Sequence, residues 1–167
     1  MIKNRLLNNA NKVDSFLKKY LNNQKYSSLI KPMKYGVLSG GKKIRSSIIL
    51  DTGRLFNINN NKLINICAAV ECIHSYSLIH DDLPCMDNDA VRRGKASTHI
   101  KFGESTAVLA ANSLLTLAFE LIADKKFPVN PVSKNDLIKS LAFFSGHMGI
   151  AGGQELDLSF EKKRKNI

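Results

Sequence analysis

The sequence predicts an all-α fold, and two observations support this. Apolar residues recur at the three- and four-residue spacing of helices along the chain, and the alternation typical of strands is not found. The breaks between apolar stretches coincide with prolines and glycines, which interrupt helices. A length of 167 residues with 44% hydrophobic content is enough for one domain with a core.

Six helices are predicted, separated by short polar segments. Pro84 ends the fourth, because the residue before a proline is pushed out of helical geometry, and Asn60 or Asn61 caps its start. Ser133 with Asp136 is typical of the cap of the last helix. The segment from 83 to 103 is predicted to be a loop. The helices span about residues 6–21, 27–38, 44–56, 62–82, 104–123 and 133–150.

The most apolar stretch, Ser105 to Ala123, is interrupted by Asn112 and Glu120. A membrane helix needs about eighteen or more consecutive apolar residues, so we expect a buried core helix and no membrane span. The three cysteines form no C-x-x-C pair, which favours reduced thiols and therefore a cytoplasmic protein.

The net charge of +11 comes from 25 lysines and arginines against 14 acidic residues. Such an excess suits nucleic acid, an anionic membrane or phosphorylated small molecules, or else reflects solvated lysine-rich faces. We expect no nucleic-acid partner, because the charge comes with no recognisable motif and little aromatic interleaving. The remaining alternatives have to be separated by the motifs.

Four aspartates within nine positions form the densest cluster of chemistry in the sequence. Asp81 and Asp82 end a mostly apolar helix, where like-charge repulsion and the negative helix terminus both disfavour them. A hard divalent cation such as Mg²⁺ resolves this, and Asp87 could fold back to the same cation. Arg92 and Arg93 follow, as expected if the metal holds an anion such as diphosphate. A self-neutralising surface loop is the alternative.

A second basic group opens the third predicted helix. The pair Gly40–Gly41 lets backbone approach a ligand closely, and helix N-termini favour anions. Lys42 and Arg45 are neighbours on one helical face, which suits a second diphosphate, although a solvated basic turn has the same pattern. His74 shares a helix face with Asp81, so it either donates to a phosphate oxygen or is a satisfied core residue.

These motifs, in this order, resemble the trans-prenyl diphosphate synthase family, and most of all its bacterial farnesyl diphosphate synthases. The segment Gly40–Arg45 is similar to the family's first substrate motif. The segment Asp81–Asp87, followed by Arg92–Gly94, is similar to its first aspartate-rich motif. The segment Gly149–Leu158 is similar to a glycine-rich stretch of the family.

The resemblance implies an isoprenoid-synthase-type helical bundle that uses Mg²⁺ to join isopentenyl diphosphate to dimethylallyl or geranyl diphosphate, giving farnesyl diphosphate. Its catalytic residues would be Asp81, Asp82 and Asp87, with Asp81 and Asp87 binding Mg²⁺ and Asp82 supporting them. Arg92 would hold the allylic diphosphate, and Tyr76 would be the floor that sets product length. Isopentenyl diphosphate would be held by Lys42, Arg45, His74 and Arg93.

Family members continue for nearly as long again and carry a second aspartate-rich motif. The hypothesis is therefore a single incomplete polyprenyl synthase domain over 1–167, with C-terminal helices missing after the lysine-rich run 161–167. Family members commonly form homodimers, so the alternative is a non-catalytic truncated homologue that pairs with a full-length synthase. A cyclising terpene synthase is disfavoured by the basic group for a second diphosphate. Lys43 and Ser46 depart mildly from the family, where arginine and proline are common.

Overall fold

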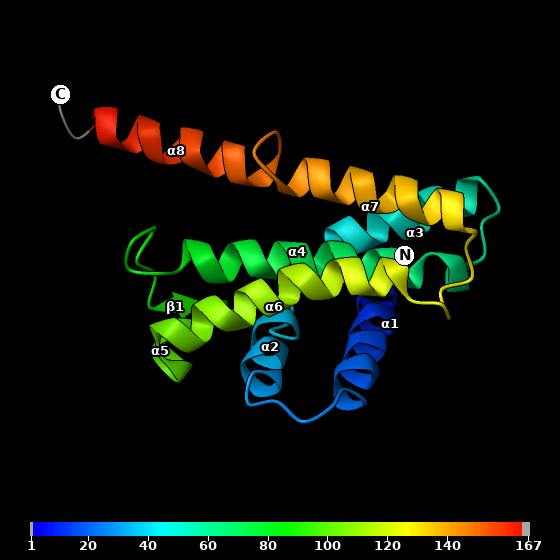
Figure 1. Cartoon of the computed structure of the whole chain (residues 1–167), viewed down its shortest axis with the longest axis horizontal. Helices are drawn as coiled ribbons and strands as arrows, with labels where there is room; N and C mark the ends of the chain where they lie inside the picture. The colour runs from blue at the N-terminus through cyan, green and yellow to red at the C-terminus, as the bar shows by residue number, and fades with distance from the viewer. Residues whose placement is uncertain (1, 165–167) are drawn as a thin grey trace. The chain divides into compact units, whose positions relative to one another are not determined.

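The computed structural model describes residues 2–164 and has the all-α fold that the sequence predicts. The chain divides into two compact units, Met1–Val129 and Asn130–Ile167. The first unit contains the helices up to α6 and a short hairpin, and the second contains α7 and α8 (Figure 1). The end of the lysine-rich run, residues 165–167, lies outside the described residues.

Most predicted helix spans agree with the structure to within a few residues, but the last one ends at Ser145 instead of about residue 150. Four further short elements and the helix α8 also appear, none of which was predicted. The second unit consists of α7 (Pro131–Ser145) and α8 (Ile150–Arg164). The first unit consists of α1 (Ile2–Asn22), α2 (Ile30–Val37), α3 (Ile44–Leu55), the 3₁₀ helix η1 (Asn60–Lys62), α4 (Ile64–Asp81), β1 (Val91–Arg92), β2 (Lys95–Ala96), α5 (Thr98–Phe102) and α6 (Glu104–Ala123).

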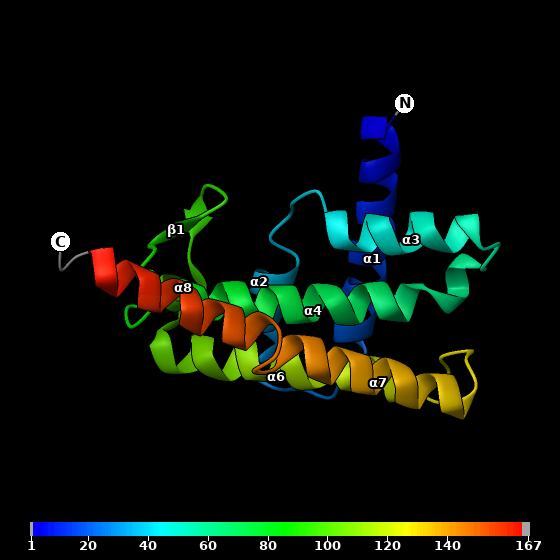
Figure 2. The ribbon, with the colours of Figure 1, turned by 90° about the horizontal axis from the view of Figure 1, so that it is seen from above.

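The core of the first unit lies between α4 and α6, which run side by side in both views (Figures 1 and 2). Small residues on the two facing sides let the helices approach closely, and helices α1, α2 and α3 pack around this pair. The pairing fixes the end of α4 that carries the aspartates. The fully buried small side chains are Cys67, Ala68, Ala69 and Cys72 of α4 and Ala107, Ala110, Ala111 and Ala118 of α6.

Two predicted helix caps were wrong by a few residues. The cap before α4 belongs to η1, where the Asn59 side chain accepts a hydrogen bond from the Asn61 N–H at 2.9 Å. The cap of α7 is Asn130, whose Oδ1 accepts from the Ser133 N–H at 2.9 Å. Pro131 then takes the first helical position, where its fixed φ and missing N–H suit a helix start. Proline therefore moves the start of α7 ahead of Ser133.

The segment predicted to be a loop contains a two-stranded hairpin and α5. Val91 pairs with Ala96 and Arg92 with Lys95. The two residues between the strands, Arg93 and Gly94, both have positive φ (54° and 74°), which is the geometry of a type I′ turn. Strands of two residues are too short for a periodicity argument to detect.

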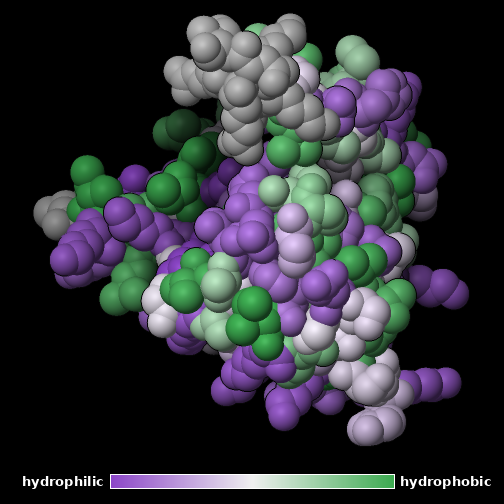
Figure 3. Space-filling view, turned by 90° about the vertical axis from the view of Figure 1, so that its left-hand side faces the viewer, coloured by the Kyte–Doolittle hydropathy of each residue, from purple (hydrophilic) through white to green (hydrophobic). Residues whose placement is uncertain are grey.

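On the face drawn in Figure 3, hydrophobic side chains (green) are interspersed with hydrophilic ones (purple).

Helix α6 is long and apolar enough, by length and composition alone, to cross a membrane. Within the described residues it is the one helix that meets this test, and 44% of its apolar window is buried inside the structure. Its buried side packs against α4, which favours the interpretation as a core helix. The absence of a membrane span stays a prediction.

The three cysteines are unpaired. Cys67 and Cys72 are buried in α4, and burial raises the pKa of each thiol to about 12. Cys85 is exposed in the turn after α4. The buried pair packs as small apolar residues.

Candidate functional site

The glycine-lysine loop, residues 40–43, enters α3 through three residues with positive φ. Gly40 and Gly41 have φ of 87° and 104°, and Lys43, the N-cap of α3, has φ of 43°. Lys42 and Arg45 are exposed, whereas Lys43 is buried. The loop thus presents two cations to solvent and turns the third inward. This is the pair that the sequence predicts for a diphosphate.

Arg93 closes over this loop from the hairpin. Its Nη1 donates to the Gly40 carbonyl and reaches Ser39 Oγ at 3.4 Å. A Cβ on residue 41 would displace the guanidinium, and the φ of 104° independently favours glycine there. The sequence predicts a close approach to the backbone at Gly41, and the group that approaches it in the structure is the Arg93 side chain.

His74 is half-buried on α4 and close to the same cations. Its pKa is lowered from 6.5 to about 4, first by burial and then by the positive charges of Arg45, Arg93 and Lys43, while Glu71 opposes the shift. The imidazole is therefore neutral at pH 7 in a strongly positive setting. The positive charges that act on His74 thus come from two other elements, Arg45 from α3 and Arg93 from the hairpin.

The aspartate segment folds back on the end of α4. The Asp87 N–H donates to the Asp81 carbonyl at 2.8 Å, and the Asp89 N–H donates to the Asp82 carbonyl at 3.2 Å. Asp81 is half-buried and Asp87 is exposed. The turn predicted from the sequence thus brings Asp81 and Asp87 next to each other.

Asp82 has a different setting from its neighbours. Only 2% of the residue is exposed, and its Oδ1 accepts from Arg92 Nε at 2.7 Å and lies 2.6 Å from Arg92 Nη2. Asp89 lies farther from the same guanidinium, at 3.8 Å. The pairing with Asp82 raises the pKa of Arg92. Asp82 therefore holds Arg92 against the end of α4.

Tyr76, the residue predicted to set product length, lies beside a histidine of the same helix. The Tyr76 ring meets the His80 ring edge-on, with centroids 4.7 Å apart. His80 is hydrogen-bonded to the backbone of Val108 on α6, and burial lowers its pKa. These contacts favour a structural role for His80. Tyr76 stays half-buried, and its role as a floor stays a prediction.

The fit of the aspartates to Mg²⁺ depends on which carboxylates can share an ion. Among residues 2–160, no group of three or more His, Cys, Asp or Glu side chains is placed to hold a metal ion. Asp82 is engaged by Arg92, whereas Asp81 and Asp87 are joined through their backbones, which brings the two residues to the same turn. Mg²⁺ typically takes one or two carboxylates together with substrate phosphates and water. This donor set suits an ion that arrives with a diphosphate.

Sequence reasoning missed a buried polar network behind the glycine-lysine loop. Glu71 of α4 accepts from Ser46 Oγ at 2.7 Å and lies 3.8 Å from Lys43 Nζ. The two positions that depart from the family's usual residues therefore meet at one carboxylate. The signal that could have found it is a lone acidic residue inside an otherwise apolar helical stretch.

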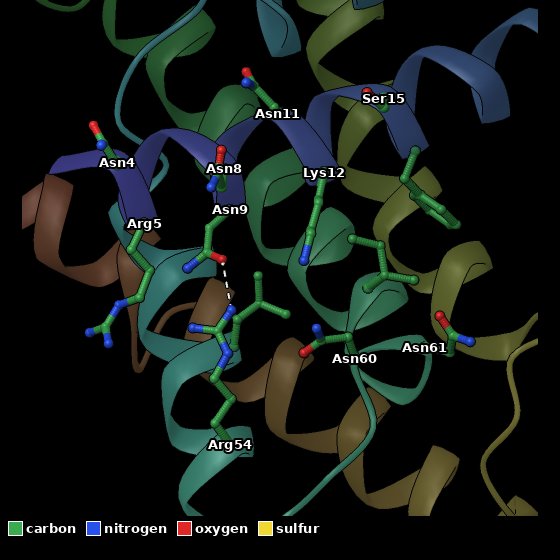
Figure 4. A pocket seen from close by; sticks show the side chains of 13 residues that line it. Asn4, Arg5, Asn8, Asn9, Asn11, Lys12, Ser15, Arg54, Asn60 and Asn61 are labelled. Carbon is green, nitrogen blue, oxygen red and sulfur yellow. Dashed lines mark hydrogen bonds between the residues drawn. The ribbon is translucent and has the colours of Figure 1, made fainter. Parts of the chain in front are cut away.

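A cavity of about 1010 Å³ lies apart from these motifs, between α1, the end of α3, η1 and the start of α4 (Figure 4). Arg54 spans it, held by Asn9 Oδ1 at 3.2 Å and by Asp51 at 2.5 Å. The predicted site residues do not line this cavity. Asparagine is the commonest residue of its lining, and Arg5, Lys12 and Arg54 are its cations.

The helical fold and the order of the two motifs define a protein of the isoprenoid synthase class. Residues 26–167 match the family described as polyprenyl synthetase. The chain belongs to this family.

Curated relatives are similar over most of the chain. It is 51% identical over 142 residues to a farnesyl diphosphate synthase of Buchnera aphidicola subsp. Acyrthosiphon pisum (strain APS), covering 84% of this chain and 50% of that protein. Identity is 48% over 136 residues to the farnesyl diphosphate synthase of Escherichia coli (strain K12), covering 81% of this chain and 46% of that protein. The chain thus spans about half the length of these relatives.

A solved structure gives the same result for the fold. An FPP/GFPP synthase from Zymomonas mobilis superposes with a TM-score of 0.90 at 38% identity, covering 95% of this chain and 58% of that chain. The expected resemblance is thereby confirmed for family and fold. The residue roles that it implies are not tested by these similarities.

Proposed function

We propose that this chain is the front part of a Mg²⁺-dependent prenyltransferase of isoprenoid biosynthesis. The enzyme would join isopentenyl diphosphate to dimethylallyl or geranyl diphosphate and release diphosphate, with farnesyl diphosphate as product. The farnesyl diphosphate synthases among its relatives support the reaction class.

One observation carries the proposal. Arg92 and Arg93, adjacent in the hairpin, serve two different groups: Arg92 binds Asp82 beside the aspartates, and Arg93 contacts the glycine loop near His74. The hairpin would therefore join two anion sites at one end of α4. A reaction between two diphosphate esters needs this arrangement, because proximity and orientation lower the barrier.

The chain's own residues would bind and orient both substrates. Lys42, Arg45 and Arg93 would hold isopentenyl diphosphate, and the neutral His74 would donate one ring N–H to it. Arg92 would hold the allylic diphosphate and stabilise the charge that grows as the carbon–oxygen bond breaks. The isopentenyl double bond then attacks the allylic carbon, and a proton leaves.

Asp81 and Asp87 would hold Mg²⁺. When bound, the ion neutralises negative charge on the departing diphosphate. Tyr76 would contact the end of the growing chain and limit it to fifteen carbons. We further propose one incomplete domain over 1–167, a cytoplasmic location and pairing of two copies as a homodimer.

The test is a product assay on the purified chain with Mg²⁺, isopentenyl diphosphate and geranyl diphosphate, with products identified by mass. A fifteen-carbon diphosphate supports the proposal for this chain alone. If product forms only after the chain is extended with the C-terminal half of a relative, the reaction is right and the chain supplies the front part. Absence of product in both forms refutes the reaction and favours a non-catalytic homologue that pairs with a full-length synthase.

A further inference from the structure

Glu71 is a buried charged residue on α4 for which the proposed reaction has no use. Only 3% of it is exposed. Its Oε1 accepts from both the hydroxyl and the N–H of Ser46, at 2.7 and 3.3 Å, and its Oε2 faces Lys43 Nζ at 3.8 Å. One carboxylate therefore connects the middle of α4 to the first turn of α3.

Lys43 is the second part of this connection. Its side chain is 3% exposed, and its Nζ donates to the Val37 carbonyl at 2.9 Å and lies 3.2 Å from Asp14 Oδ1. Its backbone is left-handed, which is uncommon for a residue with a Cβ and persists where the surroundings enforce it. The inward pull on Lys43 keeps the loop in the form that leaves Lys42 and Arg45 exposed on either side.

The geometry also connects Glu71 to His74. The two residues are three apart on α4, so their side chains are neighbours on one helix face. Glu71 is the one group named above that opposes the lowered pKa of His74. The Glu71 carboxylate thus contacts the glycine-lysine loop on one side and acts on the His74 imidazole on the other.

We propose that Glu71 is a positioning residue for the isopentenyl diphosphate site, an inference that rests on the proposed function. It holds the start of α3 at a fixed distance from α4, so that Lys42 and Arg45 converge with His74 on one diphosphate. It does not contact the substrate. Without it, the loop carrying the two cations would lose its buried anchor while the aspartate segment stays in place.

The experiment compares Glu71→Gln and Ser46→Ala with the unchanged chain by isothermal titration calorimetry. Each is titrated with isopentenyl diphosphate and, separately, with geranyl diphosphate and Mg²⁺. Glu71→Gln should weaken isopentenyl diphosphate about tenfold or more, because small misplacements of binding groups are costly, and change geranyl diphosphate less than about twofold. Ser46→Ala, which keeps the carboxylate, should show a smaller loss in the same direction.

Asn65→Ala is the matched control on α4. Asn65 is also buried and donates to the Leu121 carbonyl at 2.9 Å, so its loss destabilises the same helix away from the loop. It should lower the urea midpoint and leave both affinities unchanged.

The inference is overturned if Glu71→Gln binds isopentenyl diphosphate as tightly as the unchanged chain. It is also overturned if both ligands weaken equally, or if Asn65→Ala weakens isopentenyl diphosphate as much as Glu71→Gln does. Failure of the unchanged chain to bind isopentenyl diphosphate overturns this inference for the chain alone, whereas the proposed function is refuted separately, by absence of product from both the chain and its extended form.

Discussion

Replacing Arg92 by alanine tests how the aspartate segment is held together. The substitution leaves the Asp82 carboxylate, 2% exposed, without the guanidinium that gives it two contacts at 2.6 and 2.7 Å. Removing one partner of a fully buried ion pair costs about 3–5 kcal/mol. Because 29% of the Arg92 side chain is exposed, water screens part of the loss, and we expect about 2 kcal/mol.

A second substitution sharpens this prediction. Asp82→Asn in the Arg92→Ala background removes the uncompensated charge, so the double variant should be more stable than Arg92→Ala by about 1 kcal/mol. Urea unfolding followed by circular dichroism measures both differences. Arg5→Ala is the control, because Arg5 is 56% exposed in its 2.9 Å pair with Asp51 and should cost less than about 1 kcal/mol.

The reasoning fails if Arg92→Ala costs no more than the Arg5 control, since Asp82 would then be solvated in solution. It also fails if the double variant is less stable than Arg92→Ala. Either result would mean that Asp82 does not hold Arg92 against α4.

Three further predictions follow from the site. Asp81→Ala, made in a chain extended by the C-terminal half of a relative, should lower turnover about 100-fold or more and lower substrate affinity far less. Near-normal turnover would show that Asp81 has no role in the reaction. The pKa of His74 measured by NMR should be about 4 and should rise when pyrophosphate binds. The unfolded chain takes up this proton near pH 6.5, so the free energy of unfolding should fall as the pH is lowered from 6.5 to 4. This fall should be smaller in His74→Gln. Thiol labelling should modify Cys85 alone until denaturant exposes Cys67 and Cys72, whose pKa values are raised to about 12; fast labelling of either in the folded chain would contradict the burial.

The long helices could be predicted from the sequence because their signals are local. Helix α6 begins at Glu104 and ends at Ala123, as its apolar spacing and the preceding glycine indicate. The hairpin and α5 were not predicted, since elements of two to five residues carry too little pattern. The caps before α4 and α7 were misplaced because several polar residues in a row could each supply one.

The candidate site shows a similar division. The spacing of Asp81 and Asp87 was enough to predict that the turn folds back. Helical spacing alone left two interpretations of His74, because its cationic neighbours Arg45 and Arg93 come from other elements. The Glu71–Ser46 contact joins residues 25 apart, and nothing in the local sequence specifies that pairing.

The central claim is that one end of this chain holds two separate diphosphate sites, of which one needs Mg²⁺. The most direct measurement is calorimetric titration of the chain with isopentenyl diphosphate and geranyl diphosphate, alone and together, with and without Mg²⁺. We predict that isopentenyl diphosphate binds without the metal, that geranyl diphosphate requires it, and that saturation with one leaves the stoichiometry of the other unchanged. Mutual displacement of the two ligands, or no binding of either, would contradict the account.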